Sequence, residues 1–135
     1  MANMADAYEN EQLDGVTGVT QYTSPATTYL ALFTADPTDT GSVVNELTSG
    51  GYARTSLAGK FSAATGTDGS VANTTLIQFP AATEDWTTVT HAGIMESDVE
   101  TTDDMMMVIT LGESISILDT QTFDFAIGDL VITAA

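Results

Sequence analysis

A chain of 135 residues with 43% hydrophobic residues is long enough for one domain with a sizeable core. Nineteen acidic residues against two basic ones give a formal net charge of −17, which excludes nucleic acids and anionic membrane surfaces as partners. The absence of cysteine excludes disulfides, cysteine-ligated metal centres and thiol catalysis.

The excess of acidic residues also indicates the salt concentration to which the protein is adapted. Like charges in this number oppose a compact state, and salt relieves the repulsion because the Debye length falls to about 3 Å at 1 M. An acidic chain with a single lysine, Lys60, is the composition expected of a protein adapted to multimolar salt. An ordinary acidic domain, and an acidic surface that meets a basic partner or divalent cations, are the alternatives.

Residues 1–18 predict a short N-terminal helix. Met4, Tyr8 and either Gln12 or Leu13 fall at helical spacing, and Gly15 is a plausible stop. Such a helix is too short to be stable alone and needs to dock on the body or on a neighbour. We therefore expect an N-terminal helix or arm over residues 1–18 and a β-domain over residues 19–135. The first residues show no signal-peptide pattern, and no run is long enough to span a membrane.

Residues 27–35 form the longest apolar run and predict a strand. Alternation places Leu30 and Leu32 on one face and Tyr29, Ala31 and Phe33 on the other. Since both faces are apolar, we expect this strand to be central and covered on both sides.

Shorter strands are expected over residues 52–57, 73–79, 87–95, 105–111, 114–118, 123–127 and 130–133. In the second of these, Thr75, Ile77 and Phe79 are expected to point inward. In residues 105–111, Met105, Met107, Ile109 and Leu111 are expected to share a face, and a tight turn is expected at 112–113. Short strands with regular turn signals predict an all-β fold, a β-sandwich or jelly roll with a short N-terminal helix.

The residue types that carry chemistry do not form a catalytic pattern. His91 is the single histidine and is expected to be structural, because metal sites and triads need partners of defined type. Arg54 is the single arginine and is expected to form an ion pair with a carboxylate, which its planar fork can bind in bidentate fashion.

Two loops concentrate the acidic residues without the spacing of an EF-hand. They are the loop with Asp36, Asp39 and Glu46, and the loop with Glu96, Asp98, Glu100, Asp103 and Asp104. The chain also lacks a Gly-x-Ser-x-Gly elbow and a lysine-containing phosphate loop. We therefore expect no catalytic residues, no cofactor and no metal, and the protein is expected not to be an enzyme.

Four segments in this order resemble a known family. They are residues 29–37 with the sequence YLALFTADP, residues 50–54 with GGYAR, Phe79-Pro80 before residues 86–94 with WTTVTHAGI, and residues 127–129 with IGD before the last strand. The order is similar to that in a family of small virion proteins of tailed phages and prophages, described as tail-fibre-like or head-decoration proteins. The similarity runs from about residue 10 to the end.

The resemblance implies a β-sandwich virion component without enzymatic activity, and the acidity points to a halophilic virus. The first hypothesis is a capsid decoration (cement) protein on the shell, bound to the major capsid protein and forming a homotrimer or another homo-oligomer. Its contact residues would be Tyr8, Leu13 and Val16. The alternative is a tail, fibre or turret protein that contacts the host.

A third hypothesis is a secreted carbohydrate-binding β-sandwich. The missing signal peptide and the single candidate for an exposed stacking aromatic, Trp86, argue against it.

Overall fold

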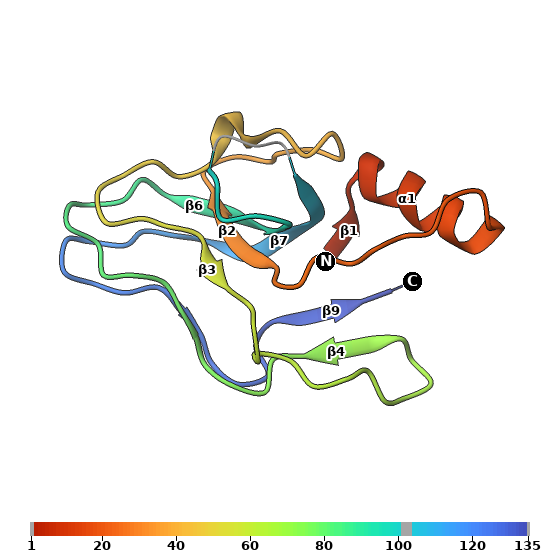
Figure 1. The fold of residues 1–135 in the computed structure, drawn as a ribbon. Helices are drawn as coiled ribbons and strands as arrows, with labels where there is room; N and C mark the ends of the chain where they lie inside the picture. Colours follow the sequence, from red (N-terminus) through yellow and green to blue (C-terminus); the bar gives the residue numbers. More distant parts are fainter. Residues whose placement is uncertain (1, 101–103, 135) are drawn as a thin grey trace.

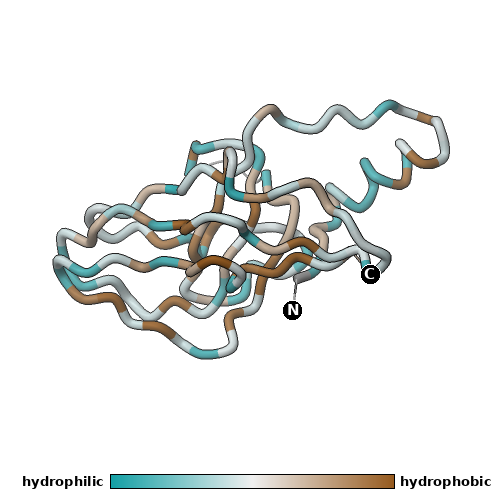
Figure 2. Tube along the Cα trace, turned by 90° about the horizontal axis from the view of Figure 1, so that it is seen from below, coloured by the Kyte–Doolittle hydropathy of each residue, from teal (hydrophilic) through white to brown (hydrophobic). Residues whose placement is uncertain are grey.

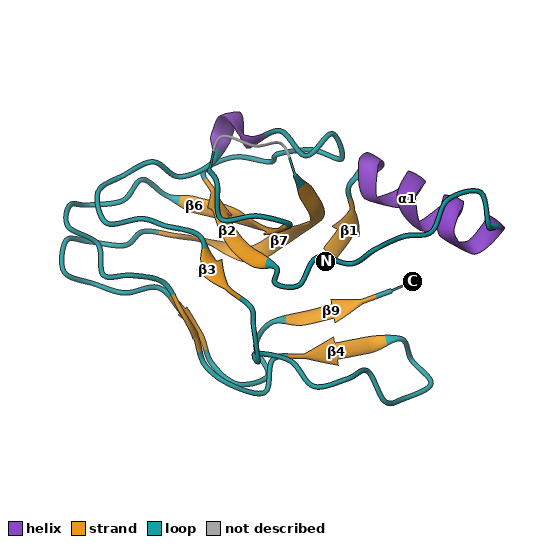
Figure 3. Cartoon of the chain, viewed as in Figure 1, coloured by secondary structure: helices purple, strands orange, loops and turns teal. Residues whose placement is uncertain are grey.

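The computed structural model describes residues 2–100 and 104–134. Antiparallel strands dominate this part of the chain, and the helix α1 lies at one end of it (Figures 1 and 3). The all-β prediction with a short N-terminal helix is confirmed. The elements in order are β1 (Ala2–Met4), α1 (Asp6–Thr17), β2 (Tyr29–Phe33), the 3-10 helix η1 (Val43–Asn45), β3 (Thr55–Ser56), β4 (Ser70–Ala72), β5 (Ile77–Gln78), β6 (Val89–Met95), β7 (Met105–Ile115), β8 (Asp124–Phe125) and β9 (Val131–Thr133).

The main sheet has five strands in the order β1-β7-β6-β2-β3, and every neighbouring pair is antiparallel. Two smaller antiparallel pairs, β4 with β9 and β5 with β8, lie below it in Figure 1. The arrangement is sandwich-like, with the short strands facing one side of the main sheet. The chain termini lie near each other in Figures 1 and 2.

The strand expected over residues 27–35 forms as β2 and is covered on both faces. Leu30 and Leu32 belong to the large core cluster, whereas Ala31 and Phe33 belong to a second, smaller cluster on the opposite face. All four side chains are fully shielded from solvent. The centre of the five-stranded sheet is nevertheless β6, because β2 is followed on its other side by the two-residue strand β3.

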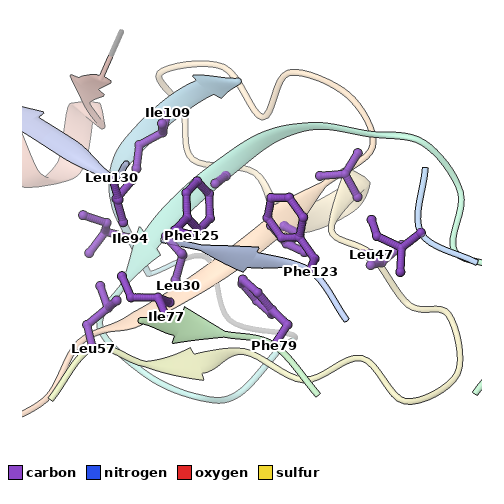
Figure 4. Close-up of a cluster of buried hydrophobic side chains, with 14 of the residues drawn as sticks. Leu30, Leu47, Leu57, Ile77, Phe79, Ile94, Ile109, Phe123, Phe125 and Leu130 are labelled. Carbon is purple, nitrogen blue, oxygen red and sulfur yellow. The ribbon is translucent and has the colours of Figure 1, made fainter. Parts of the chain in front are cut away.

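The large cluster fills the space between the main sheet and the short strands. Figure 4 shows Phe79, Phe123 and Phe125 meeting Leu30 and Ile77 there. Figure 2 shows stretches of hydrophobic residues, in brown, along the β-rich part of the chain. Burying each such side chain stabilises the fold by about 1.5–3 kcal/mol, so this layer is the main source of stability.

The predicted strand over residues 73–79 is wrong in its first half. Asn73 is buried and interrupts the strand, since its amide donates to the carbonyls of Thr75 and Ala126 and its oxygen accepts from the amide of Leu130. Thr75 is consequently exposed rather than inward, while Ile77 and Phe79 are buried as expected. A side chain that bonds to neighbouring backbone offers an alternative to strand pairing.

The strand predicted over residues 105–111 forms within β7, but the turn and the separate strand predicted after it do not. The strand β7 continues through the expected turn at 112–113 and ends at Ile115, so residues 114–115 belong to β7 and residues 116–118 are not in a strand. A register shift against β6 between Ile94 and Met95 places Met105 in the small cluster and Met107 in the large one, so they do not share a face. Such an extra residue in one strand resets the alternation of side chains.

The helix ends later than predicted. Gly18, not Gly15, is the C-cap, with a left-handed φ of 76° that glycine adopts without strain. The remaining strands are shorter than the expected ranges but lie inside them, except that β4 precedes residues 73–79 and β1 was not foreseen.

Candidate functional site

The helix α1 projects from one end of the body, beside β1 (Figure 1), and none of its residues is buried. Asp6 and Glu9 in its first turn favour this helix end, because negative charge there complements the helix dipole. The preceding residue, Ala5, is buried and hydrogen-bonded to the Met106 carbonyl, so the base of the helix is fixed to the sheet.

The inner face of α1 packs on the segment that follows it. The ring of Tyr8 meets the ring of Tyr22 edge-on, with their centroids 5.5 Å apart. Gly15 lies against the same tyrosine, where an added Cβ would stand 3.4 Å from its Cβ atom. Tyr8 therefore serves a contact within the chain, although it was predicted as an interface residue.

The outer face of α1 presents Leu13 and Val16, the other two predicted interface residues. They are three positions apart and so share one side of the helix. Their side chains are 61% and 86% exposed, and Val19, just after the helix, is 74% exposed. The structure thus brings Leu13 and Val16 together and separates Tyr8 from them.

Acidic side chains gather where α1 meets the sheet. Glu11, Glu96 and Asp104 line a small pocket of about 150 Å³ together with Tyr8. Desolvation raises the pKa of Glu96, and the charges of Glu11 and Asp104 raise it further. Within residues 2–100 and 104–134 no group of three such side chains is placed to hold a metal ion. Repulsion among these carboxylates therefore opposes the contact between α1 and the sheet.

Arg54 forms the predicted ion pair and does so in bidentate fashion. Its Nε and Nη2 atoms each lie 2.8 Å from an oxygen of Glu46, and Nη1 lies 3.0 Å from Asp104. The side chains of Arg54 and Glu46 are 0% and 2% exposed. Burial opposes the charge of the guanidinium, but the two carboxylates outweigh this, so the pKa of Arg54 is raised.

The same network includes a tyrosine that sequence reasoning missed. The Tyr52 hydroxyl donates to Glu46 over 2.8 Å and accepts from the Leu32 amide, which links the ion pair to β2. Burial and the Glu46 carboxylate raise the pKa of Tyr52, so it stays protonated as a donor. Arg54, Glu46 and Tyr52 bond to one another, and Arg54 also donates to the Ser97 carbonyl, which indicates a structural role. The Asp104 Oδ2 atom is buried without a hydrogen-bond partner among the described residues.

Neither His91 nor Trp86 presents a ligand site. His91 lies within β6 and its Nδ1 atom is 2.8 Å from the Thr90 hydroxyl. Trp86 is 3% exposed, and its indole donates to the Gly50 carbonyl over 2.8 Å. Trp86 was the single candidate for an exposed stacking aromatic, and its burial argues further against the carbohydrate-binding hypothesis.

An open groove of about 650 Å³ was not foreseen from the sequence. One wall is the distal half of β7, and the other is formed by Phe123–Phe125 and Asp129–Val131. Segments this far apart in the chain meet only because the short strands fold back over the sheet, so no local pattern signals the groove.

The family model described as "Gp80: Podophage GP4 fiber I protein gp80" matches residues 3–133. The chain belongs to this family. It is a family of tailed-phage virion proteins, so the resemblance to such proteins is confirmed at that level. No curated protein matches the chain.

The gp80 family match covers both the helix α1 and all the strands from β2 onward, which makes the exposed face of α1 part of the shared family region. No helix in the described part of the chain is long and apolar enough to cross a membrane. As a member of this family, the protein is a virion protein. Its candidate contact surfaces are the outer face of α1 and the groove beside β7.

Proposed function

We propose that this protein is a non-enzymatic structural subunit of the tail or fibre of a tailed phage. The observation that supports this is the match of residues 3–133 to a family described as a podophage fibre protein. The family description favours the tail over the capsid shell, which was the first hypothesis from the sequence. Membership in a structural family also favours a role without catalysis.

The outer face of α1 is the proposed assembly surface. A helix of 12 residues is marginal on its own, and no residue of α1 is fully buried, since Tyr8 is only partly buried against the core. Docking Leu13 and Val16 on a neighbouring subunit would remove apolar surface from water and stabilise the helix at the same time. The neighbour is another copy in a homo-oligomer or an adjoining tail protein.

A halophilic source is the second part of the proposal. A formal charge of −17 is spread over a chain whose two basic residues are Arg54 and Lys60. Arg54 is taken up by a buried ion pair, so most carboxylates have no cationic neighbour in the chain. A virion bathed in brine would have this repulsion screened.

Labelled virions test the location. Purified virions are incubated with a gold-conjugated antibody against the protein and viewed by electron microscopy. Gold confined to the tail or its fibres is the expected result. Gold spread evenly over the shell would instead support capsid decoration.

A further inference from the structure

One edge of β7 has no neighbouring strand beyond Ile109 in the described part of the chain. Among the described residues, β1 pairs with Met107–Ile109 alone, and the pairing with β6 jumps from Thr110 to Ile115 across a register shift. The intervening residues 111–114 therefore face a single β6 residue, Thr90. Residues 111–114 therefore form a bulge in the β6–β7 ladder, and their outer edge lies beyond the end of β1. Unpaired backbone of this kind is a template for another strand.

The groove beside this stretch has an apolar floor. Phe123, Phe125, Leu130 and Ile109 line it, and each is less than 10% exposed. Figure 4 shows Leu130 and Ile109 near each other, with Phe125 beside them. Val131 on the far wall is 50% exposed, so apolar surface reaches from the floor to the rim. An occupant with alternate apolar side chains would shield these groups from water.

The rim of the groove is acidic. Glu113, Asp124 and Asp129 line it and are exposed, and its lining contains no lysine or arginine. The two basic residues of the chain are engaged elsewhere, Arg54 in its ion pair and Lys60 with the Leu76 carbonyl. A second copy of so acidic a chain would be repelled here, whereas a basic segment would be attracted.

We infer that this groove binds an extended basic segment of another protein by strand addition along residues 111–114 of β7. Main-chain hydrogen bonds supply affinity, alternate apolar side chains reach the floor, and lysine or arginine side chains between them meet the acidic rim. Four strand residues span about 13 Å, so the paired stretch is short. This goes beyond a fibre role, because it assigns a partner chemistry to a surface other than α1.

Synthetic peptides test the inference on the full-length protein. The probe is a fluorescent octapeptide that alternates lysine and valine. The first comparison peptide keeps the side chains but has N-methylated valines, which cannot donate main-chain hydrogen bonds. The second keeps the backbone but has glutamate in place of lysine. We expect saturable binding of the first peptide alone by fluorescence anisotropy, with amide NMR shifts at residues 111–114.

A matched pair of variants separates the groove from the overall charge. The double variant Glu113→Gln/Asp129→Asn removes two rim charges, and Glu9→Gln/Asp98→Asn removes two exposed charges elsewhere. The rim variant should weaken binding at least about tenfold and the control less than about twofold, since each tenfold corresponds to about 1.4 kcal/mol.

Three outcomes would overturn the inference. Equal losses of peptide affinity in both double variants would mean that the peptide is attracted by the overall charge of the protein alone. Equal binding of the N-methylated peptide would exclude strand addition. Displacement of the peptide by spermine with the same amide shifts would identify a general polycation site.

Discussion

Arg54 joins three segments, since it binds Glu46 just after η1, the Ser97 carbonyl after β6 and Asp104 just before β7. Its side chain is fully shielded from solvent. Replacing it with methionine leaves the Glu46 and Asp104 carboxylates facing each other without a cation. Breaking a buried pair in this way costs about 3–5 kcal/mol. Urea unfolding of Arg54→Met, followed by circular dichroism, should show a loss of this size.

Lys60→Met is the matched control for Arg54→Met, because it removes the chain's other positive charge from a half-buried position. Its free energy of unfolding should change by less than about 1 kcal/mol. Equal losses in the two variants would mean that net charge, rather than the buried pair, sets the effect.

Glu96 provides a pH-dependent test of the contact between α1 and the body. Its pKa is raised by desolvation and by Glu11 and Asp104, so its ionisation disfavours the folded state. Protonated Glu96 contributes fully to the stability of the folded state below the ordinary pKa of a glutamate. This contribution is lost as the pH rises through the raised pKa of Glu96. Glu96→Gln should therefore raise the melting temperature at about pH 7 and leave it unchanged at about pH 3. A difference that is the same at both pH values would contradict this origin.

At the residue scale, the sequence predicted that Arg54 pairs with a carboxylate, but it did not identify which carboxylate. One arginine among 19 acidic residues was bound to meet a carboxylate, but Glu46 and Asp104 become its partners only through the pairing of distant strands. The burial of Trp86 could not be predicted for the same reason, since the Gly50 carbonyl that accepts its indole hydrogen lies 36 residues away.

At the scale of elements, α1 is the part whose exposure calls for a partner. The double variant Leu13→Gln/Val16→Gln should leave the free energy of unfolding within about 0.5 kcal/mol, because both side chains are exposed in the isolated chain. It should nevertheless sharply reduce incorporation of the protein into virions. Incorporation is measured by complementing a phage that lacks the gene and blotting the purified particles.

Val44→Gln is the control for that variant, because Val44 on η1 is 85% exposed, close to the 86% of Val16. It should be incorporated normally. Normal incorporation of the Leu13→Gln/Val16→Gln variant would show that the outer face of α1 is not an assembly surface.

Elements were predictable where the local pattern and the tertiary environment agree. The strand β2 was found because both of its faces are apolar, and the structure buries both. The strand β7 was misread because Gly112 and Glu113 resemble a turn, whereas a glycine within a strand also marks an irregular, bulged stretch. A bulge depends on the neighbouring strand, so the sequence of β7 alone does not reveal it.

At the scale of the whole molecule, charge should govern stability in salt. The free energy of unfolding should be higher in about 3 M potassium chloride than in about 0.1 M, because screening weakens repulsion among the carboxylates. Chloride is preferred to sulfate, since sulfate also strengthens apolar burial. Equal stability at both concentrations would contradict adaptation to brine.

The most direct test of a tail or fibre role is the number of copies in each virion. Quantitative mass spectrometry with isotope-labelled peptides gives the ratio of this protein to the major capsid protein in purified particles. A tail or fibre subunit should be present in a few to a few tens of copies, on the order of the symmetry of a tail assembly. A count in the hundreds, proportional to the capsid protein, would contradict the account and identify a shell protein.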